Sequence, residues 1–262
     1  MIIINMIERG LANGTDVVIV LLNIFAFLFA ITLAIVLHEL GHGYAAKWNG
    51  DMTAKYEGRL SFNPVVHFDP VGFLMMLFVG FGFAKPVPVN PYNFKKPKRG
   101  LIMVSLAGVV VNFVLAVLSM FFFVLLVFVL DNTEIFYSDI GSYFFEFFIT
   151  FFQYMILINI NLMLFNLLPL GVLDGLKVLE AFTSRGNRLT TFLRNYGMYI
   201  LYGLIGLHIL LNYVTPYVPA LIYLDILGQY LYYGNSLIAG GITTLFTHMF
   251  GMGNFGWEFF GW

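Results

Sequence analysis

The sequence predicts an all-α polytopic membrane protein that folds as one membrane-embedded domain over residues 1–262. The composition, the long uncharged stretches and the placement of the basic residues predict this class. Hydrophobic residues occupy 60% of the 262 positions and charged residues only 10%, and the mean hydropathy is +0.87. Soluble domains carry about 25% charged residues, so this chain lacks the polar surface that a water-soluble fold requires.

Four stretches without charged residues are long enough to cross a bilayer. About 20 helical residues span roughly 30 Å of hydrocarbon. Longer uncharged runs lie at 17–37, 101–130, 147–173 and 195–224. A fifth apolar run, at 226–250, predicts another helix, which we expect to break at Gly240 and Gly241.

The basic residues predict how these helices are oriented. Twelve of the thirteen Lys and Arg residues lie at 47–59, 85–99 and 177–194, whereas the connector 131–142 contains acidic residues and no basic one. By the positive-inside tendency, the three basic segments face the cytoplasm and the connector faces outward. The first helix then runs inward, the second outward and the third inward again.

Three segments on the cytoplasmic side do not read as spanning helices. Residues 52–63 are polar and β-leaning, which predicts a short strand or hairpin. The apolar run 71–84 is of marginal length for one crossing and lies between two cytoplasmic segments, so it favours a re-entrant element over two spans. Residues 85–97 contain four prolines and should be extended.

His38, Glu39 and His42 form an H-E-x-x-H pattern near the inner end of the first span. Four residues at about 100° each bring both histidines to one helix face, as two ligands of a tetrahedral zinc require, and Glu39 is suited to act as general base for a zinc-bound water. An ionisable side chain near the centre of a membrane helix costs about 2.5–3.5 kcal/mol, so this cluster needs a compensating partner. The alternative interpretation is a polar packing cluster between helices.

Asp174 is the best candidate for a third zinc ligand. The chain has no cysteine, which excludes thiolate ligands. Asp174 follows the uncharged run 147–173 and precedes the basic Lys177, and the two histidines lie about as near to their own cytoplasmic boundary. Both elements should therefore reach the same depth in the inner leaflet, which supports one shared site.

Three motifs, in this order, resemble those of the site-2 protease family of intramembrane zinc metalloproteases. The matching residues are His38, Glu39 and His42 for H-E-x-x-H, Gly108 and Asn112 for G-x-x-x-N, and Asn166, Pro169, Asp174 and Gly175 for N-x-x-P-x-x-x-x-D-G. The likeness covers about 33–179 and is greatest to the compact prokaryotic branch without a PDZ or CBS module. It implies a three-helix catalytic core at about 17–48, 101–130 and 143–175, within residues 17–180, followed by C-terminal helices at about 195–250.

The resemblance also implies a function. One zinc ion per chain would be bound by His38, His42 and Asp174, with Glu39 as general base and as proton donor to the leaving amine. The expected substrates are transmembrane or membrane-tethered proteins, cut on the cytoplasmic side of a prokaryotic cytoplasmic membrane. The rival interpretation is a metal-binding membrane transporter, which would favour repeated halves that the sequence lacks. With a net charge of −1 and no dense basic run, nucleic acid is not an expected partner.

Asn166, Asn112 and His67 are further candidate site residues. The amide of Asn166 offers donors and acceptors to an oxyanion or to the substrate backbone; the alternative is an interhelical hydrogen bond. Asn112 is a candidate for the same contacts through its motif. His67, in a loop, is a candidate for gating the site, contacting substrate or holding metal, or else for a local hydrogen bond.

Cysteine labelling tests this topology, because the chain has no native cysteine. A cysteine introduced at Ser138, in the outward connector, should react with an impermeant thiol reagent in intact cells. A cysteine at Ser184 should react only after the membrane is permeabilised. The reverse pattern would contradict the predicted orientation of every helix.

Overall fold

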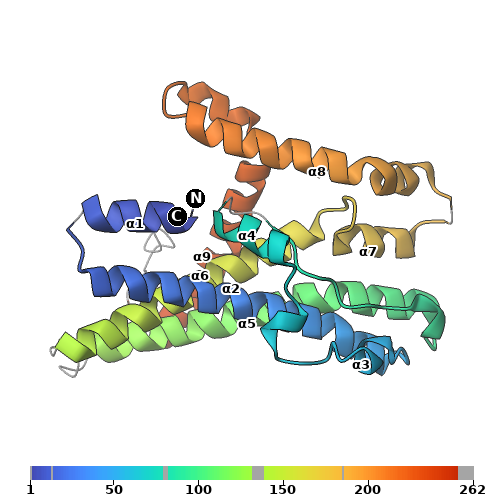
Figure 1. The fold of residues 1–262 in the computed structure, drawn as a ribbon, viewed down its shortest axis with the longest axis horizontal. Helices are drawn as coiled ribbons and strands as arrows, with labels where there is room; N and C mark the ends of the chain where they lie inside the picture. Colours follow the sequence, from blue (N-terminus) through green and yellow to red (C-terminus); the bar gives the residue numbers. More distant parts are fainter. Residues whose placement is uncertain (1, 13, 79–81, 132–138, 185, 253–262) are drawn as a thin grey trace.

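Long apolar helices make up most of the computed structural model, which describes residues 2–12, 14–78, 82–131, 139–184 and 186–252. Helices α2 (Val17–Trp48), α5 (Pro97–Asp131) and α6 (Asp139–Leu167) lie side by side, and α8 (Arg188–Val214) lies apart from them (Figure 1). Each of these four is long and apolar enough to cross a membrane. The predicted helical architecture with several candidate membrane-spanning helices is therefore confirmed.

Shorter elements connect and cover these helices. The shorter helices are α1 (Ile2–Ala12), α3 (Thr53–Tyr56), α4 (Pro70–Phe78) and α7 (Asp174–Phe182), with 3-10 segments at Pro64–Val66, Pro91–Asn93 and Pro219–Leu224. The longer α9 (Ile226–Met249) packs on α5 and α6 through an apolar cluster that includes Met120, Ile160 and Ala239. The expected break in α9 is wrong, because the helix continues through Gly240 and Gly241.

A row of small residues on α2 lets the core helices approach closely. Ala30, Ala34 and Ala46 lie at multiples of four positions along α2 and are completely buried. Residues at this spacing form one ridge of a helix, and small side chains on a ridge allow close packing in a membrane. His38 and His42 occupy the two places in this row between Ala34 and Ala46. Both histidines therefore lie within the helix–helix interface.

The third core helix ends earlier than the sequence predicts. Helix α6 stops at Leu167, whereas we expected it to continue to about residue 175. Pro169 disfavours helical geometry at the residue before it, and Gly171 turns the chain with a φ of 57°. Asp174 consequently begins the separate helix α7 and does not end a spanning helix.

The prediction of a β element at 52–63 is wrong. Thr53–Tyr56 form the short helix α3, and turns follow it. Within the described residues, β pairing is limited to one isolated bridge between Phe68 and Ala84. The carboxylate of Asp51 accepts a hydrogen bond from the N–H of Thr53, which holds the chain in a turn where a strand would have to begin.

The structure also gives no support for a re-entrant element at 71–84. The first part of this run belongs to the nine-residue helix α4, whose Leu77 packs against Phe27 and Ile31 of α2. Residues 79–81 lie outside the described part of the chain. The 85–90 segment that follows is non-helical, as its prolines predict.

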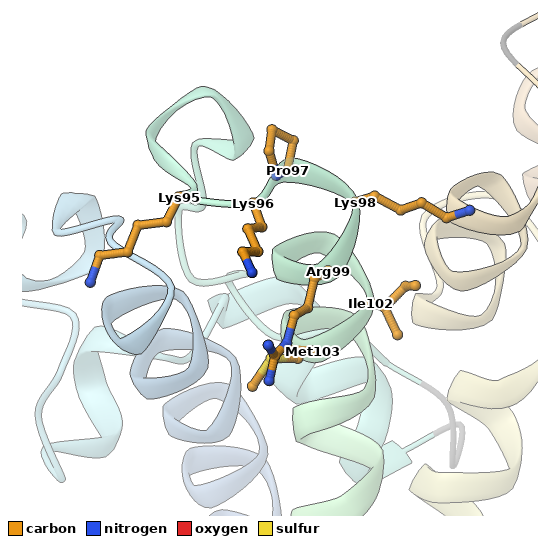
Figure 2. A pocket seen from close by; sticks show the side chains of 7 residues that line it. All are labelled: Lys95, Lys96, Pro97, Lys98, Arg99, Ile102 and Met103. Carbon is orange, nitrogen blue, oxygen red and sulfur yellow. The ribbon is translucent and has the colours of Figure 1, made fainter.

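The end of α2 and the start of α5 lie at the same end of the core (Figure 1), and the sequence places basic residues in both of these segments. Figure 2 shows a surface pocket of about 610 Å³ around the first turn of α5. Its lining residues are Lys95, Lys96, Pro97, Lys98, Arg99, Ile102 and Met103. The ammonium group of Lys98 also lies 5.6 Å from the ring centre of Phe182 on α7.

A buried carboxylate joins the end of α2 to the proline-rich segment. Asp51 is completely buried and accepts hydrogen bonds from Thr53, from the N–H of Asn90 at 2.7 Å and from Nδ2 of Asn93 at 2.9 Å. Burial by itself raises the pKa of Asp51, but these hydrogen bonds outweigh it and hold the pKa below its usual value. The ionised form of Asp51 is therefore part of the folded structure.

Asp51→Asn should lower the free energy of unfolding by about 1–3 kcal/mol at neutral pH, because a side-chain amide cannot accept all of these hydrogen bonds. Because the pKa of Asp51 is lower in the folded than in the unfolded protein, its carboxylate stabilises the fold at pH values above the unfolded-state pKa of about 3.9. This stabilisation is lost as the pH falls through the folded-state pKa. The difference between variant and wild type should thus shrink below about pH 4. Denaturant unfolding in detergent at several pH values measures the free energy of unfolding of both proteins. A difference that does not change with pH would show that the ionised carboxylate of Asp51 does not stabilise the fold.

Candidate metal centre

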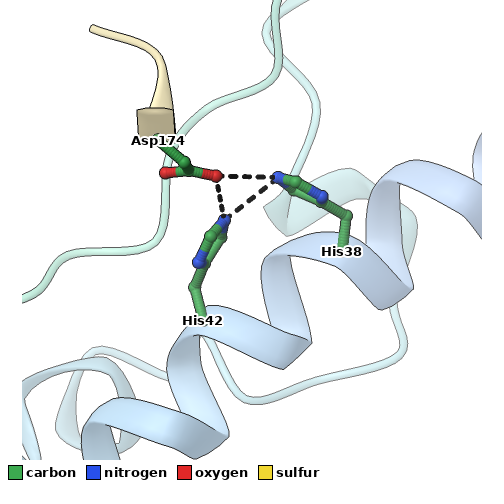
Figure 3. Close-up of side chains that lie close together, drawn as sticks. All are labelled: His38, His42 and Asp174. Carbon is green, nitrogen blue, oxygen red and sulfur yellow. Dashed lines mark hydrogen bonds and ion pairs between the residues drawn. The ribbon is translucent and has the colours of Figure 1, made fainter. Parts of the chain in front are cut away.

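Three donor atoms from two distant parts of the chain converge at a buried point. Nε2 of His42 lies 3.0 Å from Nε2 of His38 and 3.0 Å from Oδ2 of Asp174, and the third distance, from His38 Nε2 to Asp174 Oδ2, is 3.6 Å (Figure 3). All three residues are buried. The histidines come from adjacent turns of α2, and the carboxylate comes from the first turn of α7.

The chemistry of this donor set fits a zinc ion. A tetrahedral zinc site with bonds of about 2.0–2.1 Å has donor–donor edges of roughly 3.3–3.4 Å. The three donor atoms all lie within 4.8 Å of one another. Oδ2 of Asp174 has no hydrogen-bond donor within the described part of the chain. A cation between these three atoms would satisfy both the carboxylate of Asp174 and the two imidazoles.

Helix α5 orients His42 for this role. Nδ1 of His42 donates to the carbonyl oxygen of Val104 over 2.7 Å, since a carbonyl can only accept. In a neutral imidazole the proton is then on Nδ1, and Nε2 carries the lone pair that faces Asp174. Such a contact fixes both the tautomer and the ring orientation of a metal-binding histidine.

Gly108 allows α5 to lie directly against both imidazoles. A Cβ atom at this position would lie 2.5 Å from Cε1 of His38 and 2.5 Å from Nε2 of His42. Every residue other than glycine would therefore displace the two rings. The close approach of the two imidazoles therefore explains why the first position of the G-x-x-x-N motif is a glycine.

The loop before α7 and the adjacent helix α8 position Asp174. The N–H of Gly171 donates to the carbonyl of Leu193 on α8, and a Cβ at Gly197 would lie 2.2 Å from the nitrogen of Gly171. Nζ of Lys177 lies 2.9 Å from Oδ1 of Asp174 and favours the ionised form of this carboxylate.

Glu39 lies beside the three donors and is not one of them. Its carboxylate is buried, and Oε2 accepts a hydrogen bond from the backbone N–H of Val87 over 2.8 Å. The group of converging donor atoms contains only His38, His42 and Asp174 among the described residues. Glu39 is thus not among the candidate metal ligands, although it is buried next to His38 in the same helix.

The other candidate residues fall in different surroundings. Asn112 is completely buried beside His38, with no hydrogen-bond partner within 3.5 Å of either polar atom of its amide among the described residues. Nδ2 of Asn166 donates to the carbonyl of Leu162 in its own helix, and no hydrogen bond from it to another helix is seen in the described structure. Nε2 of buried His67 lies 2.8 Å from the carbonyl oxygen of Ser61, as the local interpretation expects.

The hydrogen-bond and ion-pair partners of His42, Glu39 and Asp174 were not predicted from the sequence. The carbonyl of Val104 and the N–H of Val87 are backbone groups, so no residue type marks them. Lys177, whose Nζ lies 2.9 Å from Oδ1 of Asp174, was visible only as part of a basic segment. Its spacing of three residues from Asp174 on one helix is the signal that indicates this ion pair.

Comparison with known proteins identifies the class. The sequence profile described as peptidase family M50 matches residues 26–207, a range that includes every residue of the metal centre. The chain therefore belongs to peptidase family M50, the site-2 protease family that its motifs predict, and it is a metalloprotease. This membership does not favour the transporter interpretation.

A similar protein carries a related description. The Bacillus subtilis (strain 168) protein named "Putative zinc metalloprotease YwhC" is 38% identical over 182 residues, which are 69% of this chain and 76% of that protein. No solved structure matches the chain.

Gly108→Ala should weaken zinc binding by about 10- to 100-fold, because its methyl group would displace both imidazoles. Zinc titration of the detergent-purified apoprotein measures this loss. Gly203→Ala on α8 is the matched control, since a Cβ there meets nothing within 4 Å. Equal zinc affinity in both variants would show that Gly108 does not control the site.

Proposed function

We propose that this chain is an intramembrane zinc endopeptidase that cleaves transmembrane or membrane-tethered proteins. One zinc ion per chain is bound by His38, His42 and Asp174, and Glu39 is the general base. Residues 1–262 form one membrane-embedded unit. The observation that carries the proposal is the convergence of three buried donor atoms at a helix that is long and apolar enough to cross a membrane, with the buried Glu39 directly after His38 in the sequence.

The chemistry follows from these side chains. A bound zinc ion supplies the Lewis acidity that peptide hydrolysis needs. Glu39 takes a proton from the attacking water and later gives it to the leaving amine, so one carboxylate serves as base and then as acid. His38, the residue before Glu39, already occupies the metal-facing side of α2 at this level. Glu39 is therefore available for proton transfer and not for metal binding.

Asn112 and Asn166 are the proposed contacts for the reacting carbonyl or the substrate backbone. A buried amide without partners, such as that of Asn112, would gain hydrogen bonds from a peptide that enters the site. Asn166 would have to release its present bond to Leu162 to do the same. Donors directed at a developing oxyanion are worth much more in a water-poor site than in solvent.

The placement of the site suggests where a substrate is cut. The two histidines lie in the last third of α2, near the end of the core at which the basic residues gather. The positive-inside tendency assigns this end to the cytoplasm, in a prokaryotic cytoplasmic membrane as the resemblance implies. A substrate helix must unwind to reach the metal, because its peptide bonds are shielded while it is helical.

Substitutions at Glu39 and at Asp174 should distinguish the general base from a metal ligand. Glu39→Gln should keep about one zinc per chain and lose at least 10²–10⁴-fold in cleavage rate, since it removes only the proton acceptor. Asp174→Asn, like His38→Ala and His42→Ala, should lose zinc, because an amide oxygen is a poor zinc ligand. Elemental analysis and cleavage of one single-span test protein are measured on the same preparations.

Glu57→Gln is the matched control for these variants. Glu57 is exposed at the end of α3, and its carboxylate has no ion pair or hydrogen bond among the described residues. This variant should keep both zinc and activity. Loss of zinc from Glu39→Gln, or retention of zinc and activity in Asp174→Asn, would overturn the assigned roles.

A further inference from the structure

The extended 85–90 segment crosses the face of α2 that carries Glu39. Pro86 and Pro88 have no backbone N–H, so Val87 holds the one N–H donor between them. This N–H donates to Oε2 of Glu39 over 2.8 Å, and both residues are buried. A backbone group far along the chain thus contacts the proposed general base directly.

Two hydrogen bonds fix the start of the 85–90 segment. The N–H of Lys85 donates to the carbonyl of His67 over 2.8 Å. The carbonyl of Lys85 accepts from Nη2 of buried Arg59 over 2.6 Å. The start of the segment is therefore held by groups that do not involve Glu39.

The end of the segment is fixed by Asp51, whose Oδ2 accepts from the N–H of Asn90 over 2.7 Å. Between the two ends, Gly43 lets the segment approach α2. A Cβ at Gly43, four residues after Glu39 and on the same helix face, would lie only 3.3 Å from Cγ1 of Val87. The protein thus sets the position of the Val87 N–H, and Glu39 adjusts to it.

We propose that Val87 is a positioning residue for Glu39, an inference that rests on the proposed role of Glu39 as general base. The two oxygens of a carboxylate are equivalent until one of them is bound. The N–H of Val87 fixes Oε2 and with it the rotation of the carboxylate group. Oε1 is left as the oxygen that exchanges protons with the water and the leaving amine.

This role differs in its kinetic effect from two other roles that a segment beside an active site can have. A backbone that pairs with substrate changes KM when its N–H is removed. A segment that inhibits by occupying the base gives a higher kcat when the contact is lost. A positioning contact to the base lowers kcat and leaves KM and the metal content as they were.

Val87→Pro removes this N–H, and its effect is measured on cleavage of a single-span test protein by the detergent-purified full chain. We expect kcat to fall by about 10- to 100-fold, with KM within about twofold of the wild-type value and with equal zinc content. Val89→Pro is the matched control: it is the same substitution in the same segment, at an N–H that donates to no group in the described structure. Its kcat should stay within about twofold of wild type.

If Val87→Pro does not fold, replacement of Val87 by its α-hydroxy acid analogue decides the question. This change turns the N–H into an oxygen atom and keeps the side chain. An unchanged kcat in this ester variant overturns the proposal. So does a rise in KM alone, which would assign the N–H to substrate, or a rise in kcat, which would make the contact inhibitory.

Glu39→Gln in the same assay separates the two levels of inference. If Glu39→Gln cleaves at the wild-type rate, the proposed function of Glu39 is wrong, and the role of Val87 falls with it. If Glu39→Gln is inactive while the ester variant cleaves normally, the general base stands and only the positioning role of Val87 is wrong.

Discussion

The close approach of α2 and α5 is the constraint on which the rest of the structure depends. Gly41 and Gly108 lie at this contact: a Cβ at Gly41 would be 3.2 Å from the carbonyl oxygen of Ala107, and one at Gly108 would touch both imidazoles. Only at this separation does the carbonyl of Val104 reach His42. Within a bilayer, van der Waals contact and interhelical hydrogen bonds hold helices together, so small residues decide which faces can meet. The metal centre is therefore part of the helix packing and not an addition to it.

Burial of so many polar groups inside apolar helices is costly unless each one is paired. A buried donor or acceptor without a partner costs about 1–3 kcal/mol. Among the described residues, eight buried side-chain atoms lack a partner, and four of them belong to His38, Asn112 and Asp174. The unsatisfied groups thus concentrate at the one place where a metal ion and a peptide are proposed to bind. Such a concentration is expected of a site that is completed by what it binds.

Local chemistry was predictable from the sequence, whereas contacts between distant segments were not. The spacing of H-E-x-x-H places both histidines on one helix face, and the depth argument predicts that Asp174 lies near them, as it does. The end of α6 was misjudged because the break at Pro169 acts within an otherwise uninterrupted apolar run. The β-leaning pattern at 52–63 failed because hydrogen bonds to Asp51 outweigh a weak intrinsic preference. A backbone donor such as the N–H of Val87 has no side-chain signature, so a single sequence cannot reveal its partner.

Asp174 reaches the metal centre from α7, and the loop before it rests on α8 through Gly171, Leu193 and Gly197. If Asp174 binds the metal ion as proposed, the affinity for this ion depends on how α8 docks, because α8 positions the loop before Asp174. By thermodynamic reciprocity, docking of α8 strengthens metal binding by the same factor by which bound metal strengthens the docking. A lipid or a neighbouring helix that loosens α8 lowers the fraction of metal-loaded protein without touching a ligand. The metal content of the resting enzyme is then a measure of how firmly the surrounding membrane holds one peripheral helix in place.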